Sequence, residues 1–349
     1  MRVLVAMSGG VDSSVASARL VADGHEVTGA TLKLWGGASD TGCCSVADVD
    51  DARRVADALG IAHHTFGYAE EFEADVVGPY VAAHATGATP NPCMACNRHI
   101  KFGALLERAD RLGFDAVATG HHARVAVGPD GVRRVARGAD RAKDQSYVLA
   151  GLDHDRLGRV LFPVGDLTKD AVRARARDLD LRTATKPDSQ DVCFITRAEG
   201  RHRFLGDRLA LSPGRVVDVD GAEVGAVPAV EAVTVGQRRG LGLQGGTAPR
   251  YAVDVDVAAA TVTVGAEDAL RTDAQAVTGA GVAAGPVDGE VAWQVSAHGA
   301  PRPGCLVTAA DGEAGEVWWR RPERRVAPGQ ALVAYEGDQV VAWATAARA

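Results

Sequence analysis

The feature that most constrains the fold lies near the start of the chain, where an apolar run, a glycine pair and a helical pattern follow one another. Val3-Leu4-Val5-Ala6 predicts a buried strand, and Ser8-Gly9-Gly10-Val11-Asp12-Ser13 begins two residues later. Two adjacent glycines let consecutive backbone N–H groups turn toward an anion. The start of the following helix adds the positive end of its dipole, and the serines add hydroxyl donors. This junction therefore predicts a turn that binds pyrophosphate.

The motif resembles the signature of PP-loop ATP pyrophosphatases. It lacks the Gly-Lys-Ser/Thr of a Walker P-loop, which serves transfer of the γ-phosphoryl group. The resemblance implies cleavage between the α- and β-phosphates, so that a substrate is adenylated and pyrophosphate leaves. An ordinary Gly-Ser turn is the alternative. Five fixed letters arise by chance in a chain of this length about once in a thousand, which favours the nucleotide site.

Composition indicates a chain of more than one domain. The 349 residues are 46% hydrophobic and 24% charged, which is typical of a soluble enzyme. The sequence has no apolar run long enough for a membrane span and no signal-peptide pattern at its start. Together with six cysteines in positions that suit chemistry, this predicts a reducing cytoplasm and no membrane partner.

The charge pattern bears on nucleic-acid binding. The net charge of -7 argues against a chain coated by nucleic acid, but local basic clusters are sufficient for RNA contact. The candidates are Arg133-Arg134, Arg137, Arg141, Lys143, Arg238-Arg239, Trp318-Trp319-Arg320-Arg321 and Arg324-Arg325. Because alternate strand residues face opposite sides, one tryptophan of the pair is expected in the core.

Alternating apolar and amphipathic segments over the first 200 residues predict an α/β domain. Strands are predicted at residues 2–6, 26–34, 61–66 and 114–119, and helices at 12–23, 45–59, 98–112 and 168–179. The ends of several strands are expected to converge on one site. From residue 199 onward, Val-rich runs separated by glycines predict two small β domains, the last a barrel. The domains are expected at 1–198, 199–270 and 271–349.

Two cysteines lie in a proline-containing segment, Thr89-Pro90-Asn91-Pro92-Cys93-Met94-Ala95-Cys96-Asn97. The prolines predict an extended segment, with a helix beginning at Arg98. A thiolate at a helix N-terminus is stabilised by the dipole, so Cys96 is a candidate reactive thiol.

A third cysteine, Cys193, follows a polar segment in Asp188-Ser189-Gln190-Asp191-Val192-Cys193-Phe194-Ile195. In isolation it would be read as a buried core cysteine.

A series of motifs along the chain changes this interpretation of Cys193. The chain carries, in order, SGGVDS at 8–13, NPxxxCN at 91–97, GHHAR at 120–124, KDQSY at 143–147 and DSQDVCFI at 188–195. This series resembles the family of bacterial tRNA-specific 2-thiouridylases, and the resemblance covers essentially the whole chain.

The resemblance implies a PP-loop catalytic domain, a small central β domain and a C-terminal β-barrel. It implies that ATP is bound by Ala6, Met7, Ser8, Gly9, Gly10, Val11, Asp12 and Ser13, by the Leu32 backbone and at Gly120, with Mg²⁺ on the phosphates near Asp12. Cys96 matches the nucleophile and Cys193 the cysteine that carries a persulfide. The residues that match tRNA contacts are His121, Lys143, Asp144, Gln145 and Gln330.

The family acts on the wobble uridine of glutamate, glutamine and lysine tRNAs. Its sulfur comes from a cysteine desulfurase or a sulfur relay protein. The chain departs from the family pattern at Ser296, where an arginine is expected, and this puts one C-terminal tRNA contact in doubt.

Other interpretations of the cysteines stay open. Cys93, Cys96 and Cys193 could together hold an iron–sulfur cluster, whose open iron would carry hydrosulfide in place of a persulfide. The Cys93–Cys96 pair could equally be a redox pair or a pair of zinc ligands. Cys43 and Cys44 are predicted to be structural, and Cys305 a packing residue.

Two other classes of function remain at this point. A different adenylating PP-loop synthetase would need no paired cysteines, and a non-catalytic RNA-binding or cluster-carrying module would show no ATP-dependent chemistry.

Overall fold

The computed structural model describes residues 1–34, 45–188, 192–195, 200–244, 248–308 and 314–348. The predicted structural pair Cys43 and Cys44 lies outside the described residues. The chain divides into two compact units. The first comprises Met1–Val76, Pro92–Thr196 and Gly337–Val341, and the second comprises Val77–Asn91, Arg197–Glu336 and Ala342–Ala349. Among the described helices, none is long and apolar enough to cross a membrane.

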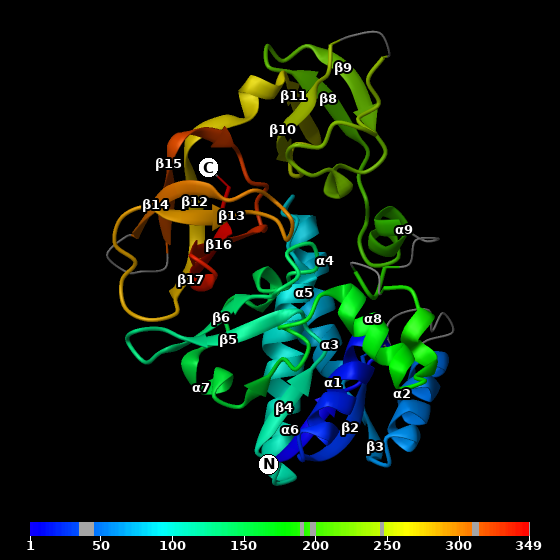
Figure 1. Ribbon diagram of the computed structural model, residues 1–349. Coiled ribbons are helices and arrows are strands. Elements are labelled where there is room, and N and C mark those ends of the chain that lie inside the picture. The colour runs from blue at the N-terminus through cyan, green and yellow to red at the C-terminus, as the bar shows by residue number, and fades with distance from the viewer. Residues whose placement is uncertain (35–44, 189–191, 196–199, 245–247, 309–313, 349) are drawn as a thin grey trace. The chain divides into compact units, whose positions relative to one another are not determined.

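The first unit is built on a parallel sheet with the strand order β3-β2-β1-β4-β7 (Figure 1). The strands are β1 (Arg2–Ala6), β2 (Glu26–Lys33), β3 (Ala62–Gly67), β4 (Ala116–Thr119) and β7 (Val160–Leu161). The first four confirm the predicted strands, with ends that differ by one or two residues. Successive residues of β1 point to opposite faces, and Val3, Leu4 and Val5 are all fully buried. Both faces of this sheet are therefore covered, which explains the unbroken apolar run.

Helices α1 (Val11–Ala22), α2 (Val46–Ala58) and α8 (Lys169–Asp178) contribute to the core over one face of the sheet. Hydroxyl side chains cap the starts of α2 and α8. The Ser45 hydroxyl accepts the Asp48 N–H at 3.2 Å, and the Thr168 hydroxyl accepts the Ala171 N–H at 3.2 Å. These bonds satisfy backbone donors that a helix leaves unpaired in its first turn.

The prediction that the segment before Arg98 is extended is wrong. A continuous helical segment begins at Pro92 and runs through α5 (Pro92–Ala95), a π-helical stretch η2 (Cys96–Ala104) and α6 (Leu105–Arg111). Proline is tolerated in the first turn because its missing N–H would have no intrahelical partner there and its φ already suits a helix. Cys93 therefore lies in the first helical turn, and Cys96 begins the π-helical stretch.

Further elements complete the two units. The remaining helices are α3 (Ala69–Phe72), α4 (Gly78–Ala85), α7 (His154–Leu157) and α9 (Gly200–Gly206), and the short helical turns are η1 (Glu73–Val77), η3 (Tyr147–Leu149), η4 (Arg182–Thr185), η5 (Val230–Ala232) and η6 (Glu267–Leu270). A hairpin of β5 (Ala123–Val127) and β6 (Arg133–Arg137) follows β4 and was not predicted from the sequence.

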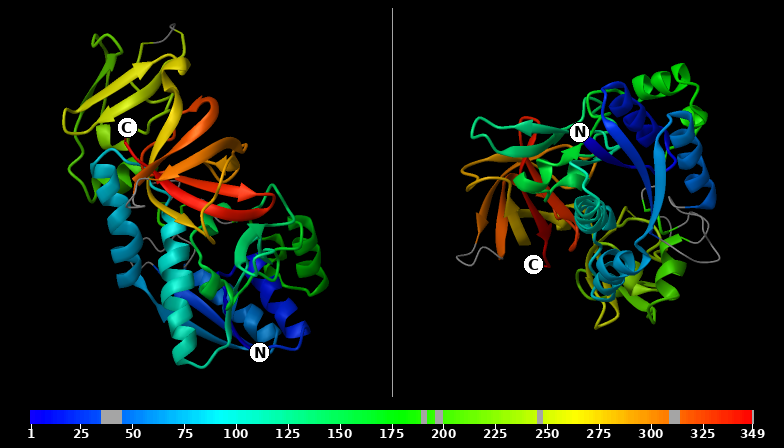
Figure 2. Two further views of the ribbon diagram at one scale, coloured as in Figure 1. Left: turned by 90° about the vertical axis from the view of Figure 1, so that its left-hand side faces the viewer. Right: turned by 90° about the horizontal axis from the view of Figure 1, so that it is seen from below.

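The second unit contains the two β structures expected from the Val-rich runs (Figures 1 and 2). One is a sheet in the order β10-β11-β8-β9, formed by β8 (Gly214–Asp218), β9 (Glu223–Val227), β10 (Tyr251–Asp256) and β11 (Thr261–Gly265). The other is a barrel in the order β12-β15-β14-β13-β16-β17, which closes because β12 also pairs with β17. Its strands are β12 (Arg271–Val282), β13 (Val291–Gln294), β14 (Arg302–Thr308), β15 (Ala314–Arg324), β16 (Ala331–Glu336) and β17 (Gln339–Ala346).

The two tryptophans of the pair Trp318-Trp319 lie on opposite sides of the barrel wall. Trp293 and Trp319 are buried, whereas the Trp318 residue is 49% exposed on the outer side of β15. The expectation that one tryptophan of the pair lies in the core is confirmed.

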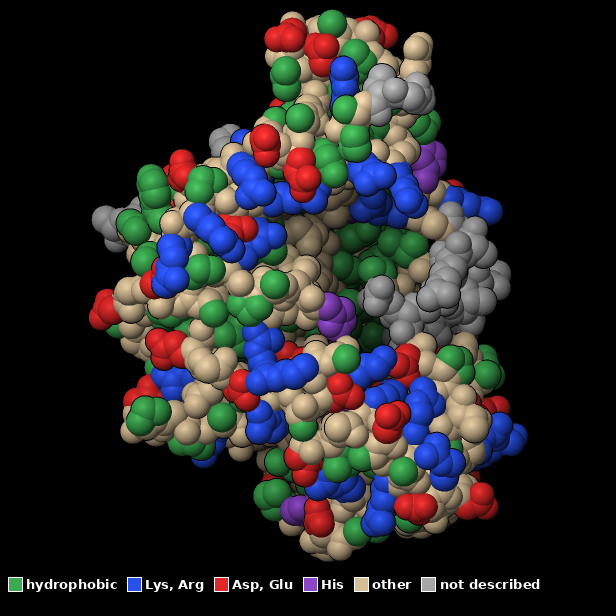
Figure 3. Space-filling view, turned by 45° about the horizontal axis from the view of Figure 1, so that its top comes forward, with side chains coloured by type: hydrophobic (Ala, Val, Ile, Leu, Met, Phe, Trp, Pro, Cys, Tyr) green, Lys and Arg blue, Asp and Glu red, His purple; other side chains and the backbone are tan. Residues whose placement is uncertain are grey.

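On the visible face of the molecule, basic and acidic side chains are interspersed (Figure 3). The fold is thus an α/β domain with a parallel sheet, followed by small β domains, as predicted.

Candidate active site

The carboxyl ends of three adjacent strands meet at one edge of the parallel sheet. Ala6 of β1 lies in register with Ala30 of β2 and with Thr119 of β4. The glycine motif follows β1, Leu32 lies near the end of β2, and Gly120 follows β4. A Cβ atom on Gly120 would lie 2.5 Å from the Ser13 backbone nitrogen, so the end of β4 touches the start of α1. The predicted convergence of these strand ends is confirmed.

The glycine motif forms a tight turn into α1. Gly9 has φ of +70°, a left-handed conformation that glycine adopts without strain. A side chain there would collide with the Asp48 backbone at the start of α2. The Ser13 and Ser14 hydroxyls donate to the Gly10 carbonyl at 3.1 and 2.8 Å. The turn thus suits close approach of a phosphate group to the N-terminus of a helix of 12 residues.

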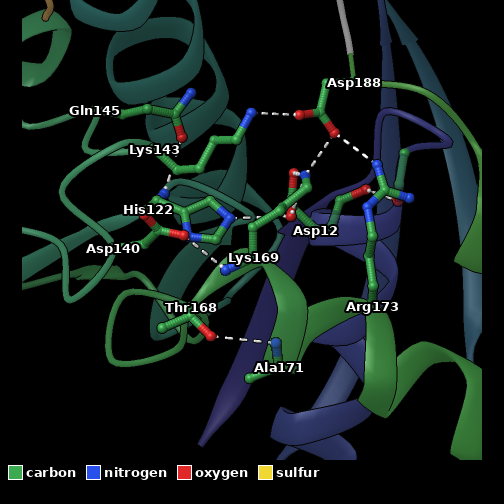
Figure 4. A network of polar contacts seen from close by, with 12 residues as sticks. Asp12, His122, Asp140, Lys143, Gln145, Thr168, Lys169, Ala171, Arg173 and Asp188 are labelled. Carbon is green, nitrogen blue, oxygen red and sulfur yellow. Dashed lines mark hydrogen bonds and ion pairs between the residues drawn. The ribbon is translucent and has the colours of Figure 1, made fainter.

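Asp12 is held by two side chains from distant parts of the chain (Figure 4). Lys169 Nζ donates to its two carboxylate oxygens at 2.7 and 2.9 Å, and His122 Nε2 donates to Oδ1 at 3.0 Å. Burial by itself would raise the pKa of Asp12, but these hydrogen bonds outweigh it and leave the pKa below its ordinary value. Asp12 is therefore a carboxylate at neutral pH.

Lys169 also contacts Asp188, the first residue of the motif that contains Cys193. Asp188 receives hydrogen bonds or ion pairs from Lys143 at 2.8 Å, Lys169 at 2.9 Å and Arg173 at 2.8 Å (Figure 4). Burial opposes ionisation of Asp188, but its hydrogen bonds from Lys143 and Lys169 hold its pKa well below the usual range. The side chain of Lys169 is only 10% exposed, so this ammonium group is shared by two carboxylates in a largely dry position.

The segment just before Asp188 is fixed to α2. Lys186 Nζ donates to Asp48 at 2.6 Å and to Asp51 at 2.8 Å. Arg173 holds the same segment from α8, because its guanidinium group donates to the carbonyl oxygens of Ala184 and Lys186 at 2.9 and 3.0 Å. The approach to the Cys193 motif is thus fixed to both α2 and α8.

The three candidate cysteines of the first unit differ in exposure. Cys96 is buried, whereas Cys93 and Cys193 are half-buried. Next to Cys193, the Phe194 ring packs edge-on against Phe72, with 5.7 Å between ring centroids. Within the described residues, no three His, Cys, Asp or Glu side chains are grouped so that they could hold a metal ion. The described arrangement therefore does not gather Cys93, Cys96 and Cys193 around one metal position.

The residues expected to contact tRNA occupy different environments. His121 is buried against Phe102 and Phe162, and its Nδ1 lies 2.7 Å from the Thr119 hydroxyl oxygen. Burial, with the nearby charges of Lys101 and His122, lowers the pKa of His121 well below its usual value and keeps it neutral.

The motif at residues 143–145 combines one exposed and two structural side chains. Asp144 is 3% exposed and binds Arg137, Ser146 and two backbone N–H groups. Gln145 accepts the His122 N–H at 2.9 Å, whereas the Lys143 side chain is 43% exposed. In the second unit, the Gln330 amide donates to the Thr89 carbonyl. The predicted tRNA contacts of these residues stay predictions.

Sequence reasoning missed His122, Lys169 and the role of Asp188. The signals available were the second histidine of Gly120-His121-His122, the Thr168-Lys169 pair at a predicted helix start, and the acidic first residue of the cysteine motif. None of these local signals shows that His122 and Lys169 contact Asp12, which lies more than a hundred positions earlier in the sequence.

Comparison with protein-family models matches three consecutive regions. Residues 1–197 match the "tRNA methyl transferase HUP domain", 202–266 the "tRNA methyl transferase PRC-barrel domain" and 284–343 the "Aminomethyltransferase beta-barrel domain". Among solved structures, NMN synthetase from Francisella tularensis shares 20% identity over 56% of this chain and 70% of that chain, with a TM-score of 0.37. A structural similarity with so low a TM-score does not support an inference about function.

Curated relatives resemble the chain much more closely. The protein named tRNA-specific 2-thiouridylase MnmA from Salinispora arenicola is 48% identical over 365 aligned positions, which cover 99% of both chains. The protein of the same name from Mycolicibacterium smegmatis is 46% identical over the full length of both chains.

Proposed function

The chain belongs to the family of tRNA-specific 2-thiouridylases, and on this basis we propose that it thiolates the wobble uridine of glutamate, glutamine and lysine tRNAs. The proposed sulfur carrier is a persulfide on Cys193. The observation that carries the proposal is the meeting of the glycine turn, Leu32 and Gly120 at one edge of the sheet. Family membership also removes the two alternatives considered above, a different PP-loop synthetase and a non-catalytic module.

The first proposed step activates the uridine. The C2 oxygen of uracil is a poor leaving group and must be activated first. It attacks the α-phosphorus of ATP, the bond from that phosphorus to the oxygen bridging the α- and β-phosphates breaks, and the N3 proton is released to water. The products are an O-adenylated uridine and pyrophosphate. Backbone donors of the glycine turn and the N-terminus of α1 are placed to stabilise the negative charge of the departing pyrophosphate.

The second proposed step transfers sulfur. The outer sulfur of the Cys193 persulfide attacks C2, and AMP leaves with the former C2 oxygen. The Cys96 thiolate attacks the inner sulfur, which breaks the sulfur–sulfur bond of the carrier and leaves a Cys96–Cys193 disulfide. If Cys96 attacks first, the released hydrosulfide attacks C2 instead, with the same products. A dithiol reductant must then restore both thiols for another turnover.

Mg²⁺ fits the chemistry of this site. Proteins commonly hold Mg²⁺ with one or two carboxylates together with substrate phosphates, and Asp12 supplies one ionised carboxylate beside the glycine turn. Mg²⁺ would neutralise phosphate charge there. Asp12 would have to share its oxygens between that ion and Lys169.

An iron–sulfur route is the second candidate mechanism. It would require Cys93 in addition to Cys96 and Cys193, and these three are not grouped as a metal site in the described structure. We therefore propose the persulfide route. The proposed setting is the cytoplasm, with a cysteine desulfurase or a sulfur relay protein as the donor.

Mass spectrometry of nucleosides tests this function directly. Unmodified glutamate tRNA is incubated anaerobically with the protein, Mg²⁺, a cysteine desulfurase and cysteine, which together supply sulfane sulfur to Cys193, with ATP present or omitted. We expect 2-thiouridine at the wobble position only when ATP is present. Cys193→Ser should still release pyrophosphate in a tRNA-dependent reaction but form no 2-thiouridine. The absence of thiolation by the wild-type protein, with intact ATP binding, would contradict the proposed function.

A further inference from the structure

The acidic residue at the start of the cysteine motif connects three segments that the reaction must coordinate. Asp188 binds Lys143, in the segment expected to contact tRNA, and both Lys169 and Arg173 of α8. Lys169 in turn donates to both carboxylate oxygens of Asp12, just after the glycine pair. One carboxylate therefore links the nucleotide turn, the expected RNA-contacting segment and the chain that leads to Cys193.

We propose that Asp188 is a positioning residue that holds the Cys193 segment beside the nucleotide turn, through the Lys169 ammonium group that it shares with Asp12. This inference rests on the proposed function. Asp188 does not contact the reacting atoms in this proposal. It acts by fixing where the segment that carries sulfur begins.

The burial of Lys169 makes this link specific. Its side chain is 10% exposed and lies within 3 Å of carboxylate oxygens from both Asp12 and Asp188. A cation in such a position needs close anionic partners because its water shell has been removed. Loss of Asp188 would leave Lys169 to Asp12 alone and would also remove the shared partner of Lys143 and Arg173.

The geometry of the chain limits how far Cys193 can lie from this anchor. Cys193 lies five positions after Asp188, so even a fully extended chain between the two spans at most about 18 Å. The preceding segment is itself held by Lys186 on α2 and by Arg173 on α8. With Asp188 fixed, Cys193 must lie within that distance of it.

A loss of positioning has a chemical consequence that differs from a loss of adenylation. If sulfur arrives late, water attacks C2 of the adenylated uridine, AMP leaves and the original carbonyl returns. Pyrophosphate has then been released without formation of 2-thiouridine. The informative quantity is therefore the ratio of pyrophosphate released to 2-thiouridine formed.

The test compares this ratio in wild type, Asp188→Asn and Asp188→Glu, with purified full-length protein, glutamate tRNA, ATP and a preloaded Cys193 persulfide. For Asp188→Asn we expect the ratio to rise about tenfold, as for loss of one hydrogen bond to a charged group. Asp188→Glu, which keeps the charge, should move the ratio back toward one. Asp166→Asn is the matched control, because it removes a carboxylate from another aspartate–arginine pair of the same unit, with Arg19.

The outcomes separate this inference from the proposed function. An unchanged ratio in Asp188→Asn overturns the positioning role. This holds whether the rates of pyrophosphate release and of 2-thiouridine formation fall together or neither rate falls. If that variant fails to fold by circular dichroism, Arg173→Gln removes one partner of Asp188, and an unchanged ratio there overturns the role as well. A wild-type protein without ATP-dependent thiolation instead overturns the proposed function itself.

Discussion

At the scale of single residues, Asp12 is the group on which the nucleotide site depends most clearly. It lies in the first turn of α1, two residues after the glycine pair, and it is the common partner of Lys169 and His122. Its lowered pKa keeps it ionised at neutral pH. Removing one member of a largely buried charge pair is costly, because the other charge loses its partner.

Asp12→Asn is expected to reduce tRNA-dependent pyrophosphate release by about 100-fold or more, the scale seen when a preorganised electrostatic group is removed from an active site. The measurement is initial-rate pyrophosphate release with saturating tRNA. Asp23→Asn is the matched control, because Asp23 caps the other end of the same helix. A rate within about twofold of wild type would show that Asp12 does not serve the adenylation step.

Cys93 distinguishes the two routes for sulfur. Under the persulfide route, Cys93→Ser should retain most 2-thiouridine formation, since neither the carrier nor the attacking thiol is changed. Under the cluster route the same variant should be inactive, because one ligand to iron is lost. The measurements are 2-thiouridine yield and iron content of anaerobically purified protein. Cys305→Ser, in the barrel, is the control for a cysteine without a proposed role.

At the scale of secondary-structure elements, α4 contains a buried histidine that makes the second unit sensitive to acid. His84 is fully buried, its Nδ1 donates to the Glu231 carbonyl at 3.1 Å, and Tyr80 lies edge-on to its ring. Burial lowers the pKa of His84 to about 4. Protonation would place an imidazolium in this apolar site, and its Nε2 has no hydrogen-bond partner among the described residues.

The second unit should therefore lose stability as the pH falls from about 6.5 toward 4. In that range the unfolded chain binds a proton at His84 and the folded chain does not, so the free energy of unfolding decreases by up to about 3 kcal/mol. Urea unfolding at several pH values measures this, followed by tryptophan fluorescence, since residues 293, 318, 319 and 343 are the tryptophans of this unit.

The matched variants are His84→Asn, which should flatten the pH dependence, and His298→Asn on the exposed surface, which should leave it unchanged. Equal pH dependence in all three proteins would contradict the assignment to His84.

At the scale of the whole molecule, the proposed chemistry oxidises the enzyme once in each cycle. Two thiols that are far apart in the sequence become a disulfide, and no further sulfur can be carried until it is reduced. The protein should therefore depend on a reductant for turnover and not for its first cycle.

With a preloaded persulfide and no reductant, 2-thiouridine should stop at about one per protein chain, and a dithiol with fresh donor should restart it. Peptide mapping without reduction should then find Cys96 linked to Cys193. Several turnovers without any reductant would contradict disulfide formation, and Cys96→Ser serves as the control that cannot form this bond.

The sequence by itself determined the local parts of this protein. The apolar run of β1, the glycine pair and the Ser45 cap act over a few residues, so their strand, turn and helix could be predicted. The helix start at Pro92 was missed because proline both breaks helices and begins them.

Only the tertiary structure decided which charges meet. Lys169 lies more than 150 positions from Asp12, and its pairing depends on the packing of α8 against α1. The burial of Asp144 and His121 follows from neighbours on other elements. Ion pairs and burial are properties of distances in space, and a local sequence pattern does not contain those distances.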